Sequence, residues 1–547
     1  MKKYFLFFLI LVALACNQEE KSTSPSYGEV FFSNNEFNAL WANLSKFSEA
    51  ASPLELKWEF LGMDSFPGID RKLPENLKGE PVELPHRLSN ANHSFWYKTK
   101  VRLEPGFLNV HADDGAQLWV NGKRARRSPL GEFFEISQTG ELELVVRVVN
   151  NAMAGGLRGL YWMGQTEFLD WKDRVAQAQD SLLSLRKNEL FLGEKEEGLD
   201  SYPILFSSPV LILGTDGSYY LRWICEKPGV AILDFGKGNE VVVESNDGVF
   251  TYELTEPSIF FTLKQEDSNF GDFIFQIPQE KESLKLAVWG DSQGGWDTFL
   301  NFSQAIANEG VDYSIGLGDL VNDGSEEWAY ERFLETASNM NTIQIPVPGN
   351  HDYDGYYEDL FPKALKSKIF RENELTYGVN YVGPMALMRV DPNTFFPVSL
   401  PEGSEQFNWF QSVINSAEWK EKPWKIIALH QPPYSQGWPG YQGEQSIRDL
   451  LEPYFDQGLI DVVMAGHTHD YERLSQEFSG NKVQFFIFGG AGGGLEPKGE
   501  DSPEPKMDEL IKEHHVGVLN LNSTELKLSV MGKNGEILDS YSLSKSQ

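Results

Sequence analysis

The pattern of apolar and polar residues changes near residue 280. Before residue 280, turns separate short segments in which apolar and polar residues alternate, as in residues 94–101 and 142–148. Alternation with a period of two predicts β-strands that bury one face. After residue 280, five short runs are apolar almost throughout, as is typical of strands covered on both faces of an α/β sheet. The pattern therefore predicts a multidomain chain with β modules first and an α/β domain last.

Three segments precede the α/β domain. Residues 27–165 carry alternating runs and an Asn-Gly hairpin signal at residues 121–122, and we predict an all-β sandwich there. In residues 166–200, apolar side chains recur at three- and four-residue steps among charged neighbours, which predicts an amphipathic linker helix. Strands return over residues 201–280, and their length and turn spacing suit a second sandwich of the fibronectin type III-like kind.

The first 26 residues have the features of an export signal followed by a tether. Two lysines precede an apolar run over residues 4–15 that is too short to span a bilayer comfortably. Residues 13–16, Ala-Leu-Ala-Cys, resemble a bacterial lipobox, so we expect Cys16 to become the lipidated first residue. The expected location is the bacterial outer membrane or cell surface, or the periplasmic face, with membrane attachment by the lipid alone. A plain secretory signal with an incidental cysteine is the alternative.

Length and charge limit the remaining choices. A chain of 547 residues is too long for one hydrophobic core. The 80 acidic and 47 basic residues give a net charge of -33, which repels nucleic-acid backbones and excludes binding to them by charge. Cys16 and Cys225 are the only cysteines, so a framework of disulfides is excluded.

Each of the five apolar runs is followed by residues of the types that bind metal ions. In an open α/β sheet, ligands collect in the crevice beyond the carboxyl ends of the strands. A glycine precedes each acidic or amide residue of the set, and we expect it to let the backbone turn sharply off the strand. Carboxylate and imidazole together suit Zn, Mn or Fe, whereas an all-oxygen set would suit Mg or Ca. The candidate ligands are Asp291, Asp319, Asn350, His430, His467 and His469.

The order of these motifs, including Gly-Asn-His-Asp at residues 349–352, resembles that of the calcineurin-like metallophosphoesterase family. Within that family, residues 430–434 (His-Gln-Pro-Pro-Tyr) and 466–473 (Gly-His-Thr-His-Asp-Tyr-Glu-Arg) are similar to the purple acid phosphatase branch. The resemblance covers residues 284–545 and implies an α/β sandwich of two β-sheets flanked by helices. Purple acid phosphatases carry a fibronectin type III-like module directly before this domain, which supports the same assignment for residues 201–280.

The resemblance implies a binuclear centre of two divalent or mixed-valence ions of Fe, Zn or Mn. Asp319 would bridge both ions, because a carboxylate can bind two cations and offset their charge. Asp291 and His469 would bind the first ion, and the other three ligands would bind the second. His467 and His469 lie two apart on an extended segment, so both imidazoles are expected to face the cleft.

The expected reaction is hydrolysis of phosphomonoesters by attack of a metal-bridging hydroxide. His351 is the candidate general acid, because it follows the ligand Asn350 and a protonated imidazole can donate to the leaving oxygen. Asp352 or Asp354 is expected to orient His351 and raise its pKa, and we predict Asp352 with His351 as the catalytic residues.

Two positions depart from the family pattern. Most of the family has a histidine two residues after the first aspartate, and purple acid phosphatases have a tyrosine three residues after the bridging aspartate. Here these positions are Gln293 and Asn322. The tyrosinate bond to iron is therefore expected to be absent, and Gln293 either binds the first metal through its carbonyl oxygen or leaves that ion more weakly held.

The loop after His430 offers candidate contacts to a phosphate ester. Tyr441 is expected to cover an organic leaving group and Arg448 to contact the phosphate, although a structural role is the alternative for both. The glycine run at residues 489–494 lacks the following helix of a phosphate loop, so we expect it to let the backbone pass close to the wall of the metal site.

The first β module resembles the galactose-binding-like jelly roll of many glycosidases through residues 95–97, 118–122 and 146–148. Trp119 or Trp162 could stack on a sugar there, although core positions are the commoner role of such aromatics. Three functions thus stay open: a phosphomonoesterase, a phosphodiesterase or nucleotide hydrolase, and a catalytically impaired, carbohydrate-binding surface lipoprotein.

Overall fold

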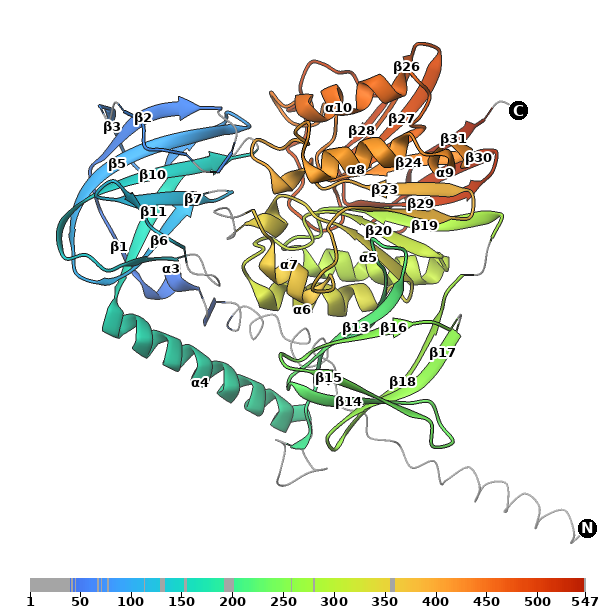
Figure 1. Cartoon of the computed structure of the whole chain (residues 1–547), viewed down its shortest axis with the longest axis horizontal. Coiled ribbons are helices and arrows are strands. Elements are labelled where there is room, and N and C mark those ends of the chain that lie inside the picture. Colours follow the sequence, from blue (N-terminus) through green and yellow to red (C-terminus); the bar gives the residue numbers. More distant parts are fainter. Residues whose placement is uncertain are drawn as a thin grey trace, which may run out of the picture.

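The computed structural model describes residue 40 and residues 43–545, apart from short gaps at 45, 66–67, 70, 76–77, 113, 128–132, 152–154, 191–200, 257, 279–280 and 355–359. The predicted export signal, Cys16 and the tether lie outside the described residues. Figure 1 shows a β-sandwich on one side, a larger two-sheet domain on the other, and a long helix and a smaller β module below them.

The N-terminal sandwich consists of two antiparallel sheets and a short helix. One sheet has the order β1-β11-β6-β9 with β4 beside β11, and the other has the order β3-β2-β5-β10-β7-β8. Alternate residues of the long strands point inward, so that Phe95, Tyr97, Leu144 and Val146 lie in one core. The elements are α3 (Phe47–Ala50), β1 (Ser52–Pro53), β2 (Trp58–Asp64), β3 (Glu80–Val82), β4 (His86–Leu88), β5 (His93–Leu103), β6 (Gly106–Ala112), β7 (Ala116–Val120), β8 (Lys123–Arg124), β9 (Phe133–Ile136), β10 (Gly140–Asn150) and β11 (Gly155–Gly164).

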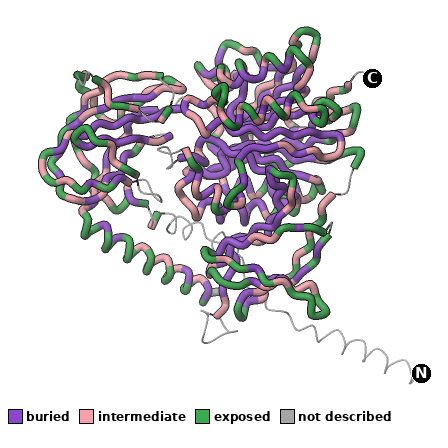
Figure 2. Tube along the Cα trace, in the orientation of Figure 1, coloured by how far each residue is buried: buried purple, intermediate pink, exposed green. Residues whose placement is uncertain are grey.

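Helix α4 (Gln165–Leu190) occupies most of the segment for which a linker helix is predicted. Its first turns pack Phe168 and Trp171 against the N-terminal sandwich. Near its other end, Lys187 forms an ion pair with Glu226 of the next module at 2.8 Å. Leu185 is 59% exposed, so the apolar stripe of the helix does not pack along its whole length. The helix is held mainly at its ends, and much of its length between them is exposed (Figure 2).

The second β module has seven strands in two sheets. Strands β14, β15, β17 and β18 form a sheet of the order β15-β14-β17-β18. The other three, in the order β16-β13-β12, continue the main sheet of the last domain through parallel pairing of β12 with β21. The module therefore shares both a sheet and a core with the domain that follows, and its fibronectin type III-like assignment stays a prediction. The strands are β12 (Leu205–Leu213), β13 (Tyr219–Cys225), β14 (Gly229–Asp234), β15 (Glu240–Ser245), β16 (Val249–Leu254), β17 (Ser258–Gln265) and β18 (Ser268–Gln276).

The last domain is built on two sheets that pack face to face. In the first, β19, β20 and β21 are parallel, and β29, β30 and β31 continue one side in antiparallel pairing. Helices α5, α6 and α7 cover its outer face. These elements are β19 (Ser283–Trp289), α5 (Trp296–Glu309), β20 (Tyr313–Leu317), α6 (Glu327–Ser338), β21 (Ile343–Val347), η3 (His351–Tyr353), α7 (Lys363–Lys368), β29 (His515–Asn522), β30 (Glu525–Gly532) and β31 (Ile537–Ser544).

The second sheet has the order β22-β23-β24-β25-β27-β26-β28, with β23, β24, β25 and β27 parallel. Helices α8, α9 and α10 cover its outer face. Its elements are β22 (Gly378–Val382), β23 (Met385–Arg389), η4 (Pro392–Thr394), α8 (Glu405–Ile414), α9 (Ala417–Glu421), β24 (Trp424–Ala428), α10 (Gln445–Phe455), β25 (Val462–Ala465), β26 (Tyr471–Phe478), β27 (Asn481–Phe488) and β28 (Glu509–Ile511).

The burial of β19 explains why its run is apolar throughout. Leu284, Leu286 and Val288 face the second sheet, whereas Ala287 and Trp289 face the helices. A strand covered on both faces needs apolar residues at every position. The predicted fold class, an α/β sandwich of two sheets preceded by β-sandwich modules, is confirmed. Among the described residues, no helix combines the length and apolar character needed to cross a bilayer.

Candidate metal centre

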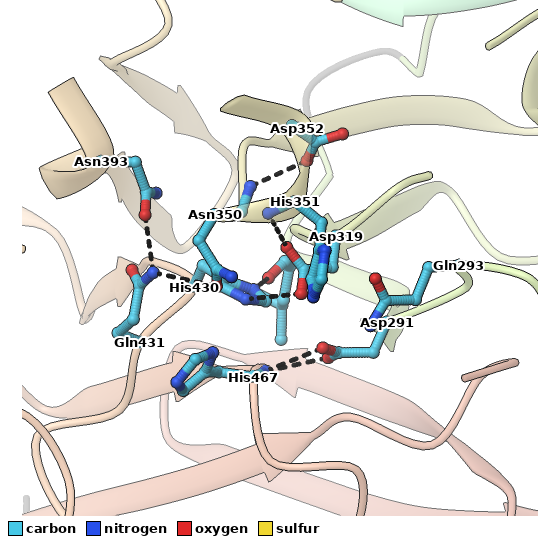
Figure 3. A network of polar contacts seen from close by, with 12 residues as sticks. Asp291, Gln293, Asp319, Asn350, His351, Asp352, Asn393, His430, Gln431 and His467 are labelled. Atoms are coloured by element: carbon cyan, nitrogen blue, oxygen red, sulfur yellow. Dashed lines mark hydrogen bonds and ion pairs between the residues drawn. The ribbon is translucent and has the colours of Figure 1, made fainter. Parts of the chain in front are cut away.

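The carboxyl ends of parallel strands from both sheets converge on one site. Asp291 and Asp319 each stand two residues beyond their strands, β19 and β20, and Asn350 stands three beyond β21. From the second sheet, His430 and His467 each stand two residues beyond β24 and β25. Because the two sheets pack face to face, these loops meet at one edge, as Figure 3 shows.

Two groups of potential metal ligands share one carboxylate. The first consists of Asp291, Asp319 and His469, and the second of Asp319, His430 and His467. In each group, one ligand atom per residue lies within 4.8 Å of the others. Asp319, which the sequence predicts as the bridging ligand, is the residue common to both groups.

Three of the ligands have left-handed backbone conformations. The φ angles are 58° at Asp291, 49° at Asp319 and 77° at His467. For a residue with a Cβ such a conformation costs about 1 to 3 kcal/mol, and residues of this kind cluster at functional sites. The unusual φ angles thus lie at the candidate ligands themselves, and among the glycines that precede Asp291, Asp319 and His467 it is Gly318 that also has a left-handed φ angle, of 94°.

The glycines are also needed for close approach. A Cβ added at Gly349 would lie 2.1 Å from Oδ1 of Asp319, and one at Gly466 would lie 2.5 Å from Oδ2 of Asp291. In the run at residues 489–494, a Cβ at Gly493 would lie 3.0 Å from Cε1 of His469. This run forms part of the wall of the site, as the sequence indicates.

Backbone carbonyls fix the imidazole tautomers. Nδ1 of His430 lies 2.8 Å from the carbonyl oxygen of Leu317, and Nδ1 of His469 lies 2.5 Å from that of Gly494. A proton on each Nδ1 would donate to the carbonyl and leave the Nε2 lone pair toward the carboxylates. Nε2 of His430 lies 3.2 Å from Oδ2 of Asp319, and Nε2 of His469 lies 3.5 Å from Oδ1 of Asp291.

Several buried polar atoms of the site have no hydrogen-bond partner in the protein. They are Nε2 of His467, Oε1 of Gln293 and Nε2 of His430, which makes no hydrogen bond although it lies 3.2 Å from Oδ2 of Asp319 as an ion pair. Unpaired buried polar atoms are rare in proteins, and the two histidines belong to the ligand group that contains Asp319. Mixed carboxylate and imidazole donors suit transition-metal ions or Zn, so the residues present fit a binuclear centre.

The charges of the site depend on one another. Burial would raise the pKa of Asp319, but His430 and His351 outweigh this effect and hold the pKa of Asp319 far below its usual value. Burial would lower the pKa of His430, but Asp319 raises it to about 9. Without metal ions the protonated imidazole of His430 thus balances the charge of Asp319, whereas burial lowers the pKa of His467 well below 6.5; bound cations would take over the balancing role.

His351 lies beside the metal centre without being in either ligand group. Its Nδ1 lies 2.8 Å from Oδ2 of Asp354 and 3.1 Å from the carbonyl oxygen of Asn322, and its backbone N–H donates to Oδ1 of Asp319 at 2.9 Å. The side chain is 28% exposed. Burial would lower the pKa of His351, but the carboxylates of Asp319 and Asp354 raise it well above 6.5.

Asp352 has a different position from the one predicted. Its carboxylate is fully buried and accepts from the N–H groups of Gly349 and Leu320 at 2.8 and 3.3 Å and from the hydroxyl of Tyr330 at 2.9 Å. Burial raises the pKa of Asp352 to about 7. Of the two residues proposed to orient His351, the one in contact is Asp354, and Asp352 instead fixes the backbone of two ligand loops (Figure 3).

Gln293 lies beside His469, a member of the first ligand group. Its Nε2 lies 3.0 Å from Nε2 of His469, while its Oε1 is buried and unpaired. In this orientation the amide donates to the ring nitrogen that a metal ion would use. The neighbouring departure, Asn322, contributes its backbone carbonyl to His351 and no phenolate to the centre.

The two predicted substrate contacts behave differently. The Tyr441 ring packs against the His467 ring with centroids 5.4 Å apart, so it forms part of the site wall beside the half-buried Trp438. Arg448 instead donates to the carbonyl oxygens of Pro433 and Gln442 at 2.7 and 2.6 Å. Its guanidinium holds the loop together, so the predicted contact of Arg448 with phosphate is not favoured.

Two residues of the site escape the sequence analysis. Gln431 donates to Oδ1 of Asn393 at 2.6 Å and to Oδ1 of Asn350 at 3.4 Å. Its position directly after the candidate ligand His430 is the feature of the sequence that could have indicated it. Asp114 of the N-terminal sandwich accepts from Nδ2 of Asn350 at 3.4 Å. No pattern in the sequence connects positions separated by so much chain.

Comparisons with known proteins agree with this geometry. Residues 284–471 match the calcineurin-like phosphoesterase family. The chain is 26% identical over 218 residues to purple acid phosphatase 21 of Arabidopsis thaliana, covering 37% of this chain and 48% of that protein. It is 24% identical over 327 residues to the probable purple acid phosphatase 20 of the same plant, covering 56% and 70%. The chain thus spans about half the length of the first of these relatives.

Among solved structures, that of purple acid phosphatase PPD1 from yellow lupin (Lupinus luteus) seeds is similar in fold. The TM-score is 0.51 at 12% sequence identity, and the match covers 82% of this chain and 93% of that one. At this identity the likeness concerns the fold alone. It extends beyond the last domain, since 82% of the chain is more than residues 284–545 provide.

Proposed function

We propose that this chain hydrolyses phosphate esters at a binuclear metal centre. The support is its calcineurin-like metallophosphoesterase domain, which has purple acid phosphatases among its homologues. The observation that carries the proposal is the pair of ligand groups that share Asp319, with a ring nitrogen of His467 that has no hydrogen-bond partner in the protein. Phosphomonoesters are the proposed substrates, and phosphodiesters or nucleotides are the alternative.

The protein side chains would prepare the site as follows. Asp291, Asp319, Asn350, His430, His467 and His469 would hold the two ions. When bound, such a pair neutralises phosphate charge and makes a hydroxide available near neutral pH. The backbone carbonyls of Leu317 and Gly494 bind Nδ1 of His430 and His469 and so keep their Nε2 atoms directed inward. The Tyr441 ring shields His467 from solvent.

His351 is the proposed general acid. Asp354 and the carbonyl of Asn322 hold its Nδ1, which leaves Nε2 for the leaving oxygen of the substrate. The neighbouring carboxylates favour the protonated imidazole that this role needs. The proton would pass from Nε2 to the leaving oxygen as the bond to phosphorus breaks.

Hydrolysis assays with defined metals test the proposal. The protein would be stripped with a chelator and supplied with Mn, Zn or Fe, and turnover of an aryl phosphate monoester would be compared with that of the corresponding diester. We expect metal-dependent turnover that favours the monoester, and loss of turnover in His467→Ala. A folded protein without turnover under any metal would contradict the proposal, and a preference for the diester would select the alternative.

Gln293 supports a second candidate, a catalytically impaired surface protein. Its amide donates to Nε2 of His469, which opposes metal binding there unless the amide turns. The same assay separates the candidates if bound metal is quantified by elemental analysis. Two ions per chain with turnover favours the enzyme, and one ion or none without turnover favours the impaired protein.

We also propose that the chain is exported and anchored by a lipid on Cys16. The support is the basic start, the short apolar run and the sequence Ala-Leu-Ala-Cys at residues 13–16. Labelling of expressing bacteria with a fatty acid should mark the wild-type protein and not Cys16→Ser. Equal absence of label from both would contradict the anchor. A carbohydrate partner for the N-terminal sandwich has less support, because Trp119 is only 4% exposed and packs against Trp96.

A further inference from the structure

The N-terminal sandwich is docked onto the catalytic domain. Nδ2 of Asn92 donates to Oε2 of Glu444 at 2.8 Å, and the N–H of Gly68 donates to the carbonyl of Phe396 at 2.6 Å. The side chains of Val149 and Phe396 are buried together. The residues of the sandwich in these contacts come from its loops and a strand end, on the side that faces the catalytic domain in Figure 1. Several contacts therefore fix the sandwich relative to the catalytic domain.

A further contact of this junction reaches the side-chain amide of the candidate metal ligand Asn350. Its Nδ2 donates at 3.4 Å to Oδ1 of Asp114, which stands two residues beyond the end of β6. Asn350 is 4% exposed and Asp114 is 3% exposed. Oδ2 of Asp114 accepts from the backbone N–H of Asn151 at 2.5 Å. Each oxygen of the Asp114 carboxylate thus faces an N–H donor, one from the catalytic domain and one from the sandwich.

The other end of the Asn350 amide lies toward the metal ligands. Its Oδ1 accepts at 3.4 Å from Nε2 of Gln431, the residue that directly follows the ligand His430 (Figure 3). The backbone N–H of the next residue, His351, donates to Oδ1 of Asp319 at 2.9 Å. Nδ2 of Asn350 is therefore on the side of the sandwich, and Oδ1 is on the side of the second ligand group.

The orientation of this amide decides whether Asn350 can bind a cation. The two ends of the amide have nearly the same shape, but the oxygen carries the lone pairs that a metal ion needs. A carboxylate accepts hydrogen bonds and donates none, so Asp114 pairs with the NH2 end of the amide and not with its oxygen. Rotation of the amide by half a turn would bring oxygen against oxygen at Asp114 and would point the NH2 group at the cation.

We propose that Asp114 is a positioning residue for the second metal ion, because it keeps Oδ1 of Asn350 turned toward that ion. The N-terminal sandwich then completes the metal centre without supplying a ligand. Hydrogen-bond partners behind a metal ligand typically contribute about 10- to 100-fold to metal affinity. This proposal rests on the proposed function, because it concerns one of the two ions of that centre.

Titration of the full-length protein with Mn²⁺ tests this role without requiring turnover. Asp114→Asn keeps the shape of the side chain but has only one accepting end. We expect its oxygen to accept from the N–H of Asn151, which leaves its NH2 group against that of Asn350 and favours the rotated amide. After removal of metal with a chelator, calorimetry should show that the affinity for one of two ions falls by about 10- to 100-fold.

Two further variants separate positioning of the amide from packing. Asp114→Ala removes the carboxylate and lets the Asn350 amide adopt either orientation, so its loss of affinity should be smaller than that of Asp114→Asn. Packing alone predicts the reverse order, since asparagine fills the space that alanine leaves empty. The exchange variant, Asp114→Asn with Asn350→Asp, has an oxygen ligand at position 350 and a donor at position 114. It should recover most of the lost affinity.

The control is Asp170→Asn, the same chemical change at an exposed position of α4, which should bind both ions as the wild type does. Wild-type affinity in Asp114→Asn, a larger loss in Asp114→Ala, or no recovery in the exchange variant would overturn the role of Asp114. If Asp114→Asn does not fold, Asp114→Ala decides: weaker binding of one ion supports the role, and wild-type affinity overturns it. A wild-type protein that binds fewer than two ions would instead overturn the proposed centre, and this role with it.

Discussion

At His351, two effects act in opposite directions on one imidazole. Burial disfavours its charge, whereas Asp319 and Asp354 favour it, and the carboxylates prevail. Asp354 is the residue that contacts Nδ1, although Asp352 is nearer in the chain. The one-turn 3-10 helix His351–Tyr353 explains the difference, because it directs Asp352 into the core and leaves His351 facing the cleft.

Replacement of His351 by alanine should reveal its role through the leaving group. Aryl phosphates release a stable phenolate and need little protonation, whereas alkyl phosphates release a basic alkoxide. We expect the loss in kcat to be about 10²- to 10⁴-fold for an alkyl phosphate and clearly smaller for a nitrophenyl phosphate. Steady-state kinetics with both substrates measure this, and equal losses for both would exclude a general-acid role.

At the scale of elements, the strand-to-loop junctions determine the geometry of the centre. Parallel strands of two sheets end at the same edge, and each junction brings a ligand within a few residues of its strand. The junctions are crowded, as the contact between Gly349 and the carboxylate of Asp319 shows. A small residue at that position is therefore a condition for the bridging ligand.

Gly349→Ala should disrupt the centre while the sheets remain folded. The added Cβ would lie 2.1 Å from Oδ1 of Asp319, so the bridging carboxylate must move. We expect loss of bound metal and a fall in kcat of at least about 10²-fold, since misplacement by about 1 Å can have that effect. Metal analysis and circular dichroism measure the two properties. Gly164→Ala, where a Cβ would meet open space, is the control, and full metal content in Gly349→Ala would contradict the prediction.

At the scale of the whole molecule, the junction between the sandwich and the catalytic domain contains a buried acid. Glu444 is 3% exposed and accepts from Asn92 across the junction. Burial raises the pKa of Glu444 to about 7 from its usual 4.5. The folded protein therefore binds a proton at Glu444 more tightly than the unfolded chain does.

This difference predicts a loss of stability as the pH rises. Below about pH 4.5 the carboxyl is protonated in both states, and the stability that it contributes is fully present. Between about pH 4.5 and 7 that contribution is lost, by up to about 3 kcal/mol for a difference of about 2.5 pH units. Glu444→Gln should thus unfold at a higher temperature than wild type at pH 8 and at a similar one at pH 5.

Thermal unfolding at the two pH values measures the effect. Glu104→Gln, a change at an exposed site, should behave as wild type at both. If Glu444→Gln and wild type show the same dependence on pH, the junction does not carry a buried, titrating acid.

The sequence alone determined the fold class and the types of residue that gather where the strands of the last domain end. Apolar runs in the last domain predict doubly covered strands, and the residues that follow them predict ligands at the edge of a sheet. The fold class is confirmed, and residues 284–471 match the calcineurin-like phosphoesterase family. These features are encoded locally, because the periodicity of a strand and the residue after its end concern one short stretch of chain.

Only the tertiary structure decided which side chains meet across loops. In the folded chain, Asp352 accepts from the N–H of Gly349 and Arg448 donates to the carbonyl of Pro433. Strand β12 pairs with the main sheet of the catalytic domain. The fold also brings Asp114 to Asn350, 236 residues away. Such contacts depend on how separately folded surfaces dock, and docking depends on shape and charge over whole surfaces, which no short pattern of residues records.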